Sequence, residues 1–476
     1  MWTSVLPVVL ASASLGALPQ DDLRARDAVI ARMEYVLDQA KASASLDGLA
    51  VVVQSGDDVW WSKGFGWLDA RAQRAARPEA SLAGGALLPP LTALAIAKLA
   101  DAKKLRLDDE VSKWFPELSG ERPTDLGGAR AGERSPEHGE RSLGRAGLTL
   151  RQVLAHASGL PACDAWVDAR SRAGTPTTRE DVLAWLAGEP LDFAPGTCFA
   201  FSSSDVLVAG WIVERVAEKD FASFVRTDLC GELRLDTLRR THVPEAGERF
   251  AEAWGEAGGE LASLGRTGAL LGADTLTTSA LDLARLARGA ARGSIVSDDV
   301  WRELATPFAL ANGQTRTQGL GFDLACLGEF PTVGFGGSAY GACLHATYYP
   351  EYDLAIALVA PGERASLDLV ERRLARVFLD LAEPEVLDLP LARDERAPLL
   401  GGYYVGCNRA VVSEEEGRLY LSLPERERLA LFYQGAHAFV VEGDAERSLE
   451  FEVRDGRAER FVLEDRGSRT VGVRMD

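Results

Sequence analysis

The stretch 78-PEASLAGGALLPPLTALAIAKLAD-101 decides the fold that we expect for this chain. Its second half is almost continuously small and apolar, with large apolar residues at the spacing of a helix face. Pro89 and Pro90 cannot sit inside a helix, but they fit its first turn, where the backbone N–H has no partner. We therefore predict a buried helix that begins near residue 88, directly after the tight turn Gly84-Gly85-Ala86.

A turn of small residues before a central helix is where some hydrolases hold their nucleophile, because the helix N-terminus stabilises developing negative charge. The run 64–118 resembles this part of the serine β-lactamase-like family, which includes class C β-lactamases, penicillin-binding DD-peptidases and related esterases. The ungapped match to the family form PDTLFRIGSxxKPFTALA puts the serine of S-x-x-K at Ala86 and its lysine at Pro89. Neither residue can supply the hydroxyl or the amine that the motif uses.

Two further family motifs also match, but other residues replace their catalytic side chains. The run 198-CFAFSSSDVLVAGWIVERVAEKDF-221 resembles FxYSNxGYxLLGxIIExVTGKxF, which places the tyrosine at Phe201 and the asparagine at Ser203. The run 331-PTVGFGGSAYGACLHATYYPE-351 resembles VGHGGGTPGFSSxLALDPE, which places the histidine at Phe335 and keeps Gly336 and Gly337. The resemblance implies that this segment is a strand beside the cleft, following a strand at Gly319–Phe322.

No shifted alignment restores these motifs. None of the lysines has a serine three positions earlier, neither asparagine follows a tyrosine or serine by two positions, and [KH]-[ST]-G is absent. We therefore expect no intact catalytic set. The degenerate positions and their neighbours are the candidate ligand-cleft residues: Ala86, Pro89, Phe201, Ser202, Ser203, Phe335, Gly336, Gly337, Ser338 and Tyr340.

His156 lies in 148-LTLRQVLAHASGLP-161, which resembles ITIRxLLTHTSGLP of the family. The family does not use this histidine in catalysis, so we expect a half-buried residue at a helix end. The alternative is a rebuilt hydrolase, in which one of the serines at 202–204 is the nucleophile and His156 or Asp205 assists it.

The resemblance implies an α/β (α+β) sandwich, in which an antiparallel sheet is flanked by helices and an all-α lobe is inserted. We expect a signal peptide at 1–17, a β-lactamase-like domain at 22–382, a linker at 383–398 and a lipocalin-like β-barrel at 399–476. Further predictions from pattern are helices at 22–43 and 366–382, strands at 49–54, 60–62 and 65–68, and a mobile loop at 119–147 with a solvated His138. For the barrel we favour packing on the main domain over holding an apolar ligand.

The chain has 476 residues and a formal charge of −19, without a basic run, which argues against nucleic acid and anionic membrane surfaces as partners. Apart from the expected signal, no apolar stretch is long enough to span a membrane. The six cysteines have irregular spacing, so we expect no metal site and no cofactor. Cys163–Cys198 and Cys326–Cys343 are the candidate disulfides, and buried thiols are the equal alternative.

These observations favour a pseudoenzyme, secreted or periplasmic, that binds a peptide, a glycan, a small molecule or a protein partner in the old cleft. The competing hypothesis is a serine hydrolase (esterase, peptidase or β-lactamase-like) with rearranged catalytic residues. Two phenylalanine replacements make the cleft more apolar rather than differently polar, which favours the pseudoenzyme.

Overall fold

The computed structural model of the chain describes residues 23–44, 46–69, 74–119, 145–231, 233–239, 267–272, 276–315, 317–339, 341–362, 367–423 and 428–475. Three predicted features lie outside these residues. They are the signal peptide at 1–17, most of the loop at 119–147 with His138, for which we predict a solvated side chain, and Tyr340. Near the end of that predicted loop, Arg145 is buried, and its guanidinium donates to the carbonyls of Leu186, Ala187 and Glu189.

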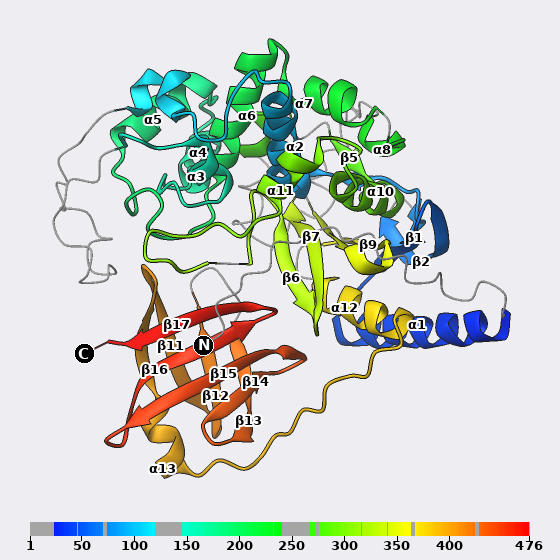
Figure 1. Cartoon of the computed structure of the whole chain (residues 1–476), viewed down its shortest axis with the longest axis vertical. Helices are drawn as coiled ribbons and strands as arrows, with labels where there is room; N and C mark the ends of the chain where they lie inside the picture. Colours follow the sequence, from blue (N-terminus) through cyan, green and yellow to red (C-terminus); the bar gives the residue numbers. More distant parts are fainter. Residues whose placement is uncertain are drawn as a thin grey trace.

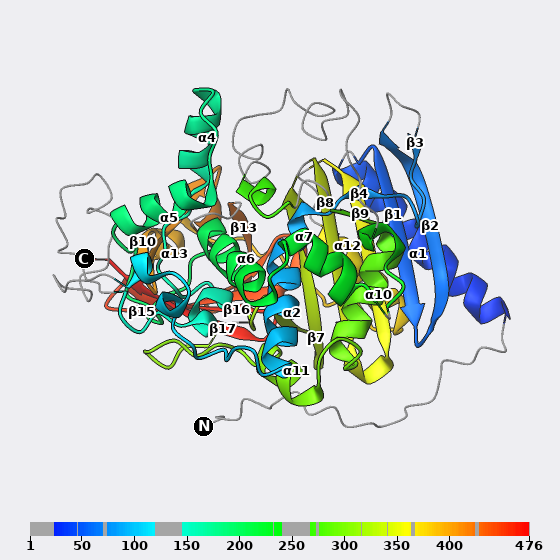
Figure 2. The same cartoon turned by 90° about the horizontal axis from the view of Figure 1, so that it is seen from above.

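The main domain is built on a seven-stranded antiparallel sheet in the order β3-β2-β1-β9-β8-β7-β6. Helices α1 (Leu23–Ala44) and α12 (Leu367–Phe378) pack on one face, and α2 (Leu88–Asp101) and α10 (Ala280–Ala291) lie on the other (Figures 1 and 2). The strands are β1 (Gly48–Ser55), β2 (Asp58–Asp69), β3 (Arg74–Ala75), β6 (Asp323–Leu327), β7 (Phe330–Ala339), β8 (Ala342–Tyr349) and β9 (Leu354–Pro361).

A helical lobe covers the α2 side of the sheet (Figure 2). It contains α3 (Leu150–Leu154), α4 (Asp164–Arg172), α5 (Arg179–Gly188), α6 (Ser203–Ala217) and α7 (Phe221–Phe224). The described part of the domain also contains two further helices, α8 (Asp236–Arg239) and α11 (Asp298–Leu304), and the short pair β4 (Leu82–Ala83) with β5 (Thr277–Thr278). The antiparallel sheet with flanking helices confirms the predicted fold class.

The central helix is where the sequence places it. α2 begins at Leu88, directly after the 3-10 turn Gly85–Leu87, with both prolines in its first turn. Ten of its fourteen residues are buried, because it packs against α6 and α11 as well as the sheet side of the core. Helices α1 and α12 also confirm the predictions at 22–43 and 366–382, although α12 ends earlier, at Phe378.

The structure corrects two local predictions. The segments 60–62 and 65–68 are strand residues as predicted, but they belong to one continuous strand, β2. Residues 58–66 pair with β1, the end of the strand pairs with β3, and Gly66 adopts a positive φ without breaking it. Gly319–Phe322 is a bend rather than a strand. Gly321 has φ +82° there, and a Cβ on it would lie 2.5 Å from the Cβ of Ala93, so only glycine lets this bend pack on α2.

The C-terminal part is a closed eight-stranded antiparallel barrel, and α13 (Arg393–Arg396) precedes it (Figure 1). Its strands are β10 (Gly401–Val405), β11 (Asn408–Glu415), β12 (Arg418–Ser422), β13 (Leu429–Gly435), β14 (Ala438–Val441), β15 (Asp444–Arg454), β16 (Arg457–Asp465) and β17 (Ser468–Arg474). Buried aromatic rings fill the interior, with Tyr403 and Phe451 each close to Phe461 at 5.0 and 5.8 Å between ring centroids. These rings occupy the space inside the barrel that an apolar ligand would need.

One disulfide joins the two parts, and it is not a pair that the sequence suggested. Cys198 lies in the helical lobe, between a turn at 195–197 and α6. It is bonded to Cys407 in the barrel, and the two Cα atoms are 6.0 Å apart. Cys163 stays a buried thiol and Cys326 a half-buried one, so neither predicted pair forms. Cys326 and Cys343 lie on β6 and β8, with β7 between them, which is too far for a bridge. Within the described part of the chain, no helix is long and apolar enough to cross a membrane.

We predict that Cys407→Ser destabilises the docking of the barrel. The bond spans 209 residues, and loss of such a crosslink costs about 2–4 kcal/mol of unfolding free energy. Denaturant unfolding, followed with and without dithiothreitol, measures this loss. Reductant should destabilise the wild-type protein and leave C407S unaffected; an equal response of both proteins would contradict the clamp.

Candidate ligand-binding cleft

Ala86 and strand β7 form the centre of the candidate cleft. Ala86 lies in the 3-10 turn before α2, and this turn packs directly against β7. A Cβ added to Gly337 would sit 3.6 Å from the Cβ of Ala86. The backbone of β7 therefore runs past the position where the family carries its serine, and the group that meets it is a methyl.

The other replaced positions surround this point without adding an ionisable group. Pro89 lies in the first turn of α2, where its ring takes the place of an amine. Phe335 is only 3% exposed, and its ring lies 6.1 Å from that of Phe322 and within the main core. Phe201 is 41% exposed, which makes it the aromatic ring among these positions that a ligand can reach.

The segment of β7 beside Ala86 has an open edge. Strand β6 pairs with β7 only from Phe330 to Gly334, whereas β8 pairs with it from Val333 to Ala339. Among the described residues, 335–339 thus has a strand neighbour on one side only. Gly336 and Gly337 are exposed and Ser338 is partly exposed, so an extended chain can add to this edge by backbone hydrogen bonds.

The three serines at the start of α6 do not form a nucleophile–base pair with His156. Ser204 Oγ donates to the carbonyl of Pro161 at 2.7 Å, and Ser203 Oγ lies 3.7 Å from Cys163 Sγ. Ser202 Oγ is buried with no hydrogen-bond partner among the described residues. Only the backbone N–H of Ser202 approaches His156, at 3.5 Å from Nδ1.

His156 instead belongs to a buried network with Asp205 and Ser158. Its Nδ1 lies 3.0 Å from Asp205 Oδ2, and the Ser158 hydroxyl donates to Asp205 Oδ1. Burial raises the pKa of Asp205, while hydrogen bonds from His156 and Ser158 oppose that shift. Ser158 also accepts from the N–H of Leu160 at 2.9 Å, so the network ties the 156–160 turn to α6.

His156 is thus buried rather than half-buried, and its ring lies 4.7 Å from that of Phe201. Ser158 was not predicted as a site residue from the sequence. Its position two residues after His156, in a turn of small residues, could have indicated that it lies close to the histidine. Within the described residues, no group of three or more His, Cys, Asp or Glu side chains is arranged to hold a metal ion.

The family model described as Beta-lactamase matches residues 29–379, well over half of the chain. The chain belongs to this family. Penicillin-binding protein 4* of Bacillus subtilis (strain 168) is 22% identical over 450 residues, which cover 89% of this chain and 94% of that protein. The match therefore extends from the main domain into the barrel.

Solved structures share the fold. The octameric penicillin-binding protein homologue from Pyrococcus abyssi has 20% identity and a TM-score of 0.57, covering 93% of this chain and 99% of that chain. SurE with D-Leu has 21% identity and a TM-score of 0.56, covering 95% and 99%. A D-stereospecific amidohydrolase from Streptomyces sp. has 18% identity and a TM-score of 0.54, covering 74% and 99%.

If the His156 network is structural, Ser158→Ala will lower stability. The change leaves an oxygen of the buried Asp205 carboxyl and the Leu160 N–H without their partner, which costs about 1–3 kcal/mol. Urea unfolding measures this loss in the free energy of unfolding. Ser112→Ala is the matched control, because Ser112 bonds only to Glu110 on the surface at 3.2 Å; equal stability of the two variants would contradict a structural role.

Proposed function

We propose that this protein is a catalytically inactive member of the β-lactamase family that binds an extended peptide-like ligand in the old active-site cleft. The observation that carries the proposal is the contact of Ala86 with the Gly337 segment of β7. This contact keeps the geometry that would bring a substrate to the nucleophile, while the atom that would attack is a methyl carbon. A bound peptide would be held there without turnover.

A peptide fits the cleft better than a glycan does. The open edge at 335–339 offers a row of backbone donors and acceptors, which an extended peptide matches residue by residue. Exposed glycines let a second backbone approach closely, and Phe201 offers an apolar face for one side chain. Relatives described with D-Leu or as D-stereospecific amidohydrolases favour a peptide that ends in a D-residue as the first ligand to test.

We further propose a secreted or periplasmic location. The Cys198–Cys407 disulfide supports it, because such bonds persist in oxidising compartments. The apolar sequence at 1–17 supports it as well.

A hydrolase with rearranged residues is the second candidate, and the buried His156–Asp205 pair beside three serines is the observation that favours it. In a serine triad, the aspartate of such a pair orients the histidine base and stabilises its protonated form. Against it stands the geometry, because the three hydroxyls point to Cys163, to Pro161 or to no partner instead of to the imidazole.

Binding without cleavage is testable with fluorescein-labelled tripeptides that end in D-Leu or L-Leu. We expect a rise in fluorescence anisotropy on binding and no new product by liquid chromatography. Phe201→Ala should weaken binding about tenfold through loss of an aromatic contact. Tyr35→Ala is the matched control, since Tyr35 is an aromatic residue on α1, on the opposite face of the sheet, and is 66% exposed. Cleaved peptide, or equal affinities of the two variants, would contradict the proposal.

A further inference from the structure

A second cavity lies behind the cleft strand, between the main sheet, α12 and the barrel. It encloses about 330 Å³ and is lined by β6, β7 and β8, by α12, and by the barrel residues Arg447, Asp465 and Arg466. Gly336 and Gly337 form part of its wall. A Cβ on Gly336 would lie 2.6 Å from His345 Nδ1, so Gly336 faces His345 on this side of the sheet.

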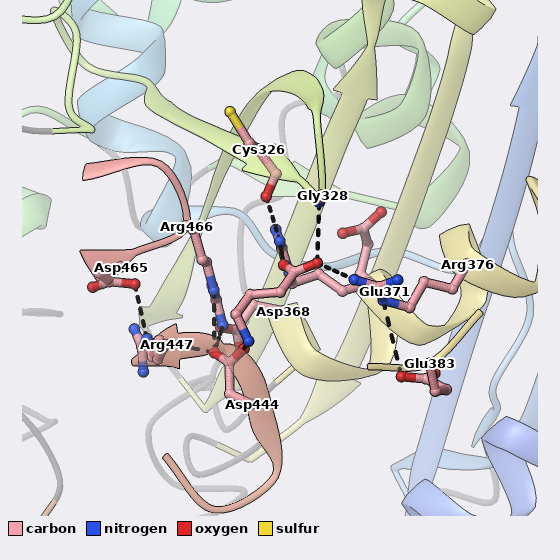
Figure 3. A network of polar contacts seen from close by, with 12 residues as sticks. Cys326, Gly328, Asp368, Glu371, Arg376, Glu383, Asp444, Arg447, Asp465 and Arg466 are labelled. Carbon is pink, nitrogen blue, oxygen red and sulfur yellow. Dashed lines mark hydrogen bonds and ion pairs between the residues drawn. The ribbon is translucent and has the colours of Figure 1, made fainter. Parts of the chain in front are cut away.

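The arginines of this cavity are already paired with carboxylates (Figure 3). Arg466 bonds to Asp444 at 2.7 Å and to Asp368 at 2.9 Å, and Arg447 bonds to Asp465 at 2.9 Å. Arg372 pairs with Glu446 across the domain boundary. Four carboxyl groups and three guanidiniums line the cavity. Because each guanidinium has its carboxylate, the site offers no unpaired cation to an anionic ligand.

Glu371 is different, because one of its oxygens lacks a partner. Its side chain is fully buried and rises from α12 toward the sheet (Figure 3), where Oε1 accepts from the Tyr349 hydroxyl at 2.8 Å. Oε2 makes no hydrogen bond of normal geometry in the described part of the chain, although the nearby Thr347 hydroxyl helps to lower the pKa of Glu371. The His345 Nε2 atom lies 3.9 Å from Glu371 Oε2 and 3.0 Å from Thr347 Oγ1.

A buried acceptor without a donor costs free energy, and a charged donor satisfies it best. We propose that this cavity binds a small organic ammonium ion, whose N–H groups donate to Glu371 Oε2. The excess of carboxyl groups in the lining and the prior pairing of every lining arginine favour a cation over an anion. The cavity shares Gly336 and Gly337 with the Ala86 cleft but lies on the α12 side of the sheet, and this proposal does not depend on the function proposed for the cleft.

The charged groups around Glu371 give the binding a distinctive pH dependence. Tyr349 and His345 face it from β8, Arg372, Arg376 and Asp368 from α12, and Arg466 with Asp444 from the barrel. Burial raises the pKa of Glu371 to about 7 and lowers that of His345 to about 4, so His345 is neutral and Glu371 titrates near neutrality. An ammonium ion binds the carboxylate form, so affinity should rise about tenfold from pH 6 to pH 8.

Benzylamine is the probe, with benzyl alcohol and benzoate as uncharged and anionic matches. Ligand-observed NMR titration of the full chain should give tenfold tighter binding of benzylamine than of either match at pH 8. Glu371→Gln keeps the acceptor for Tyr349 and should lose at least tenfold in affinity together with the pH dependence. Ala325→Leu, on β6, should block the cavity from another wall.

Glu303→Gln is the matched control, because Glu303 pairs with Arg151 on the surface and lies outside the cavity. It should bind benzylamine like the wild-type protein. Equal binding of benzylamine and benzyl alcohol, unchanged binding by folded E371Q or A325L, or no binding of benzylamine by the wild-type protein would each overturn the proposal.

Discussion

The contact between the Ala86 turn and the glycines of β7 is the constraint on which this molecule depends. It brings the N-terminus of the central helix against the sheet, where a Cβ placed on Gly337 would meet the Cβ of Ala86 at 3.6 Å, an ordinary van der Waals distance. The contact is made by backbone and small groups, so it survives the loss of every reactive side chain in the family's motifs. The geometry of this region is therefore maintained independently of the side chains at the family's catalytic positions.

The apolar residues at the family's catalytic positions contribute to the structure by packing, which polar catalytic side chains would not do. Phe335 joins Phe322 and Trp301 in a buried cluster of edge-to-face aromatic rings, where an ionisable side chain would have had to be desolvated. The polar groups that remain nearby are used internally, with Asp205 accepting from His156 and Ser158. Phe335 and the His156 network are part of the packing here, and the open face of the candidate cleft is the β7 edge with Phe201.

Much of the fold could be predicted from the sequence, because local patterns dictate it. The two prolines and the small apolar run predicted the start of α2, and the β-barrel predicted at 399–476 is present as a closed barrel of eight strands. The Cys198–Cys407 bond was not predictable, because it depends on how the barrel docks. Glu371 had a signal that was missed, since it falls between Leu367 and Leu374 on the apolar face of α12, but its lone oxygen depends on β8 and the barrel.

Intact-mass spectrometry tests the central claim most directly, with the folded protein treated separately with a fluorophosphonate probe and a fluorescent penicillin. Both reagents acylate or phosphonylate an activated serine, and the chain has only Ala86 at the family position. The account predicts the unmodified mass with each reagent, while a serine β-lactamase treated in parallel is labelled. A stoichiometric adduct would contradict it, and peptide mapping to a serine at 202–204 would identify the protein as a rearranged hydrolase.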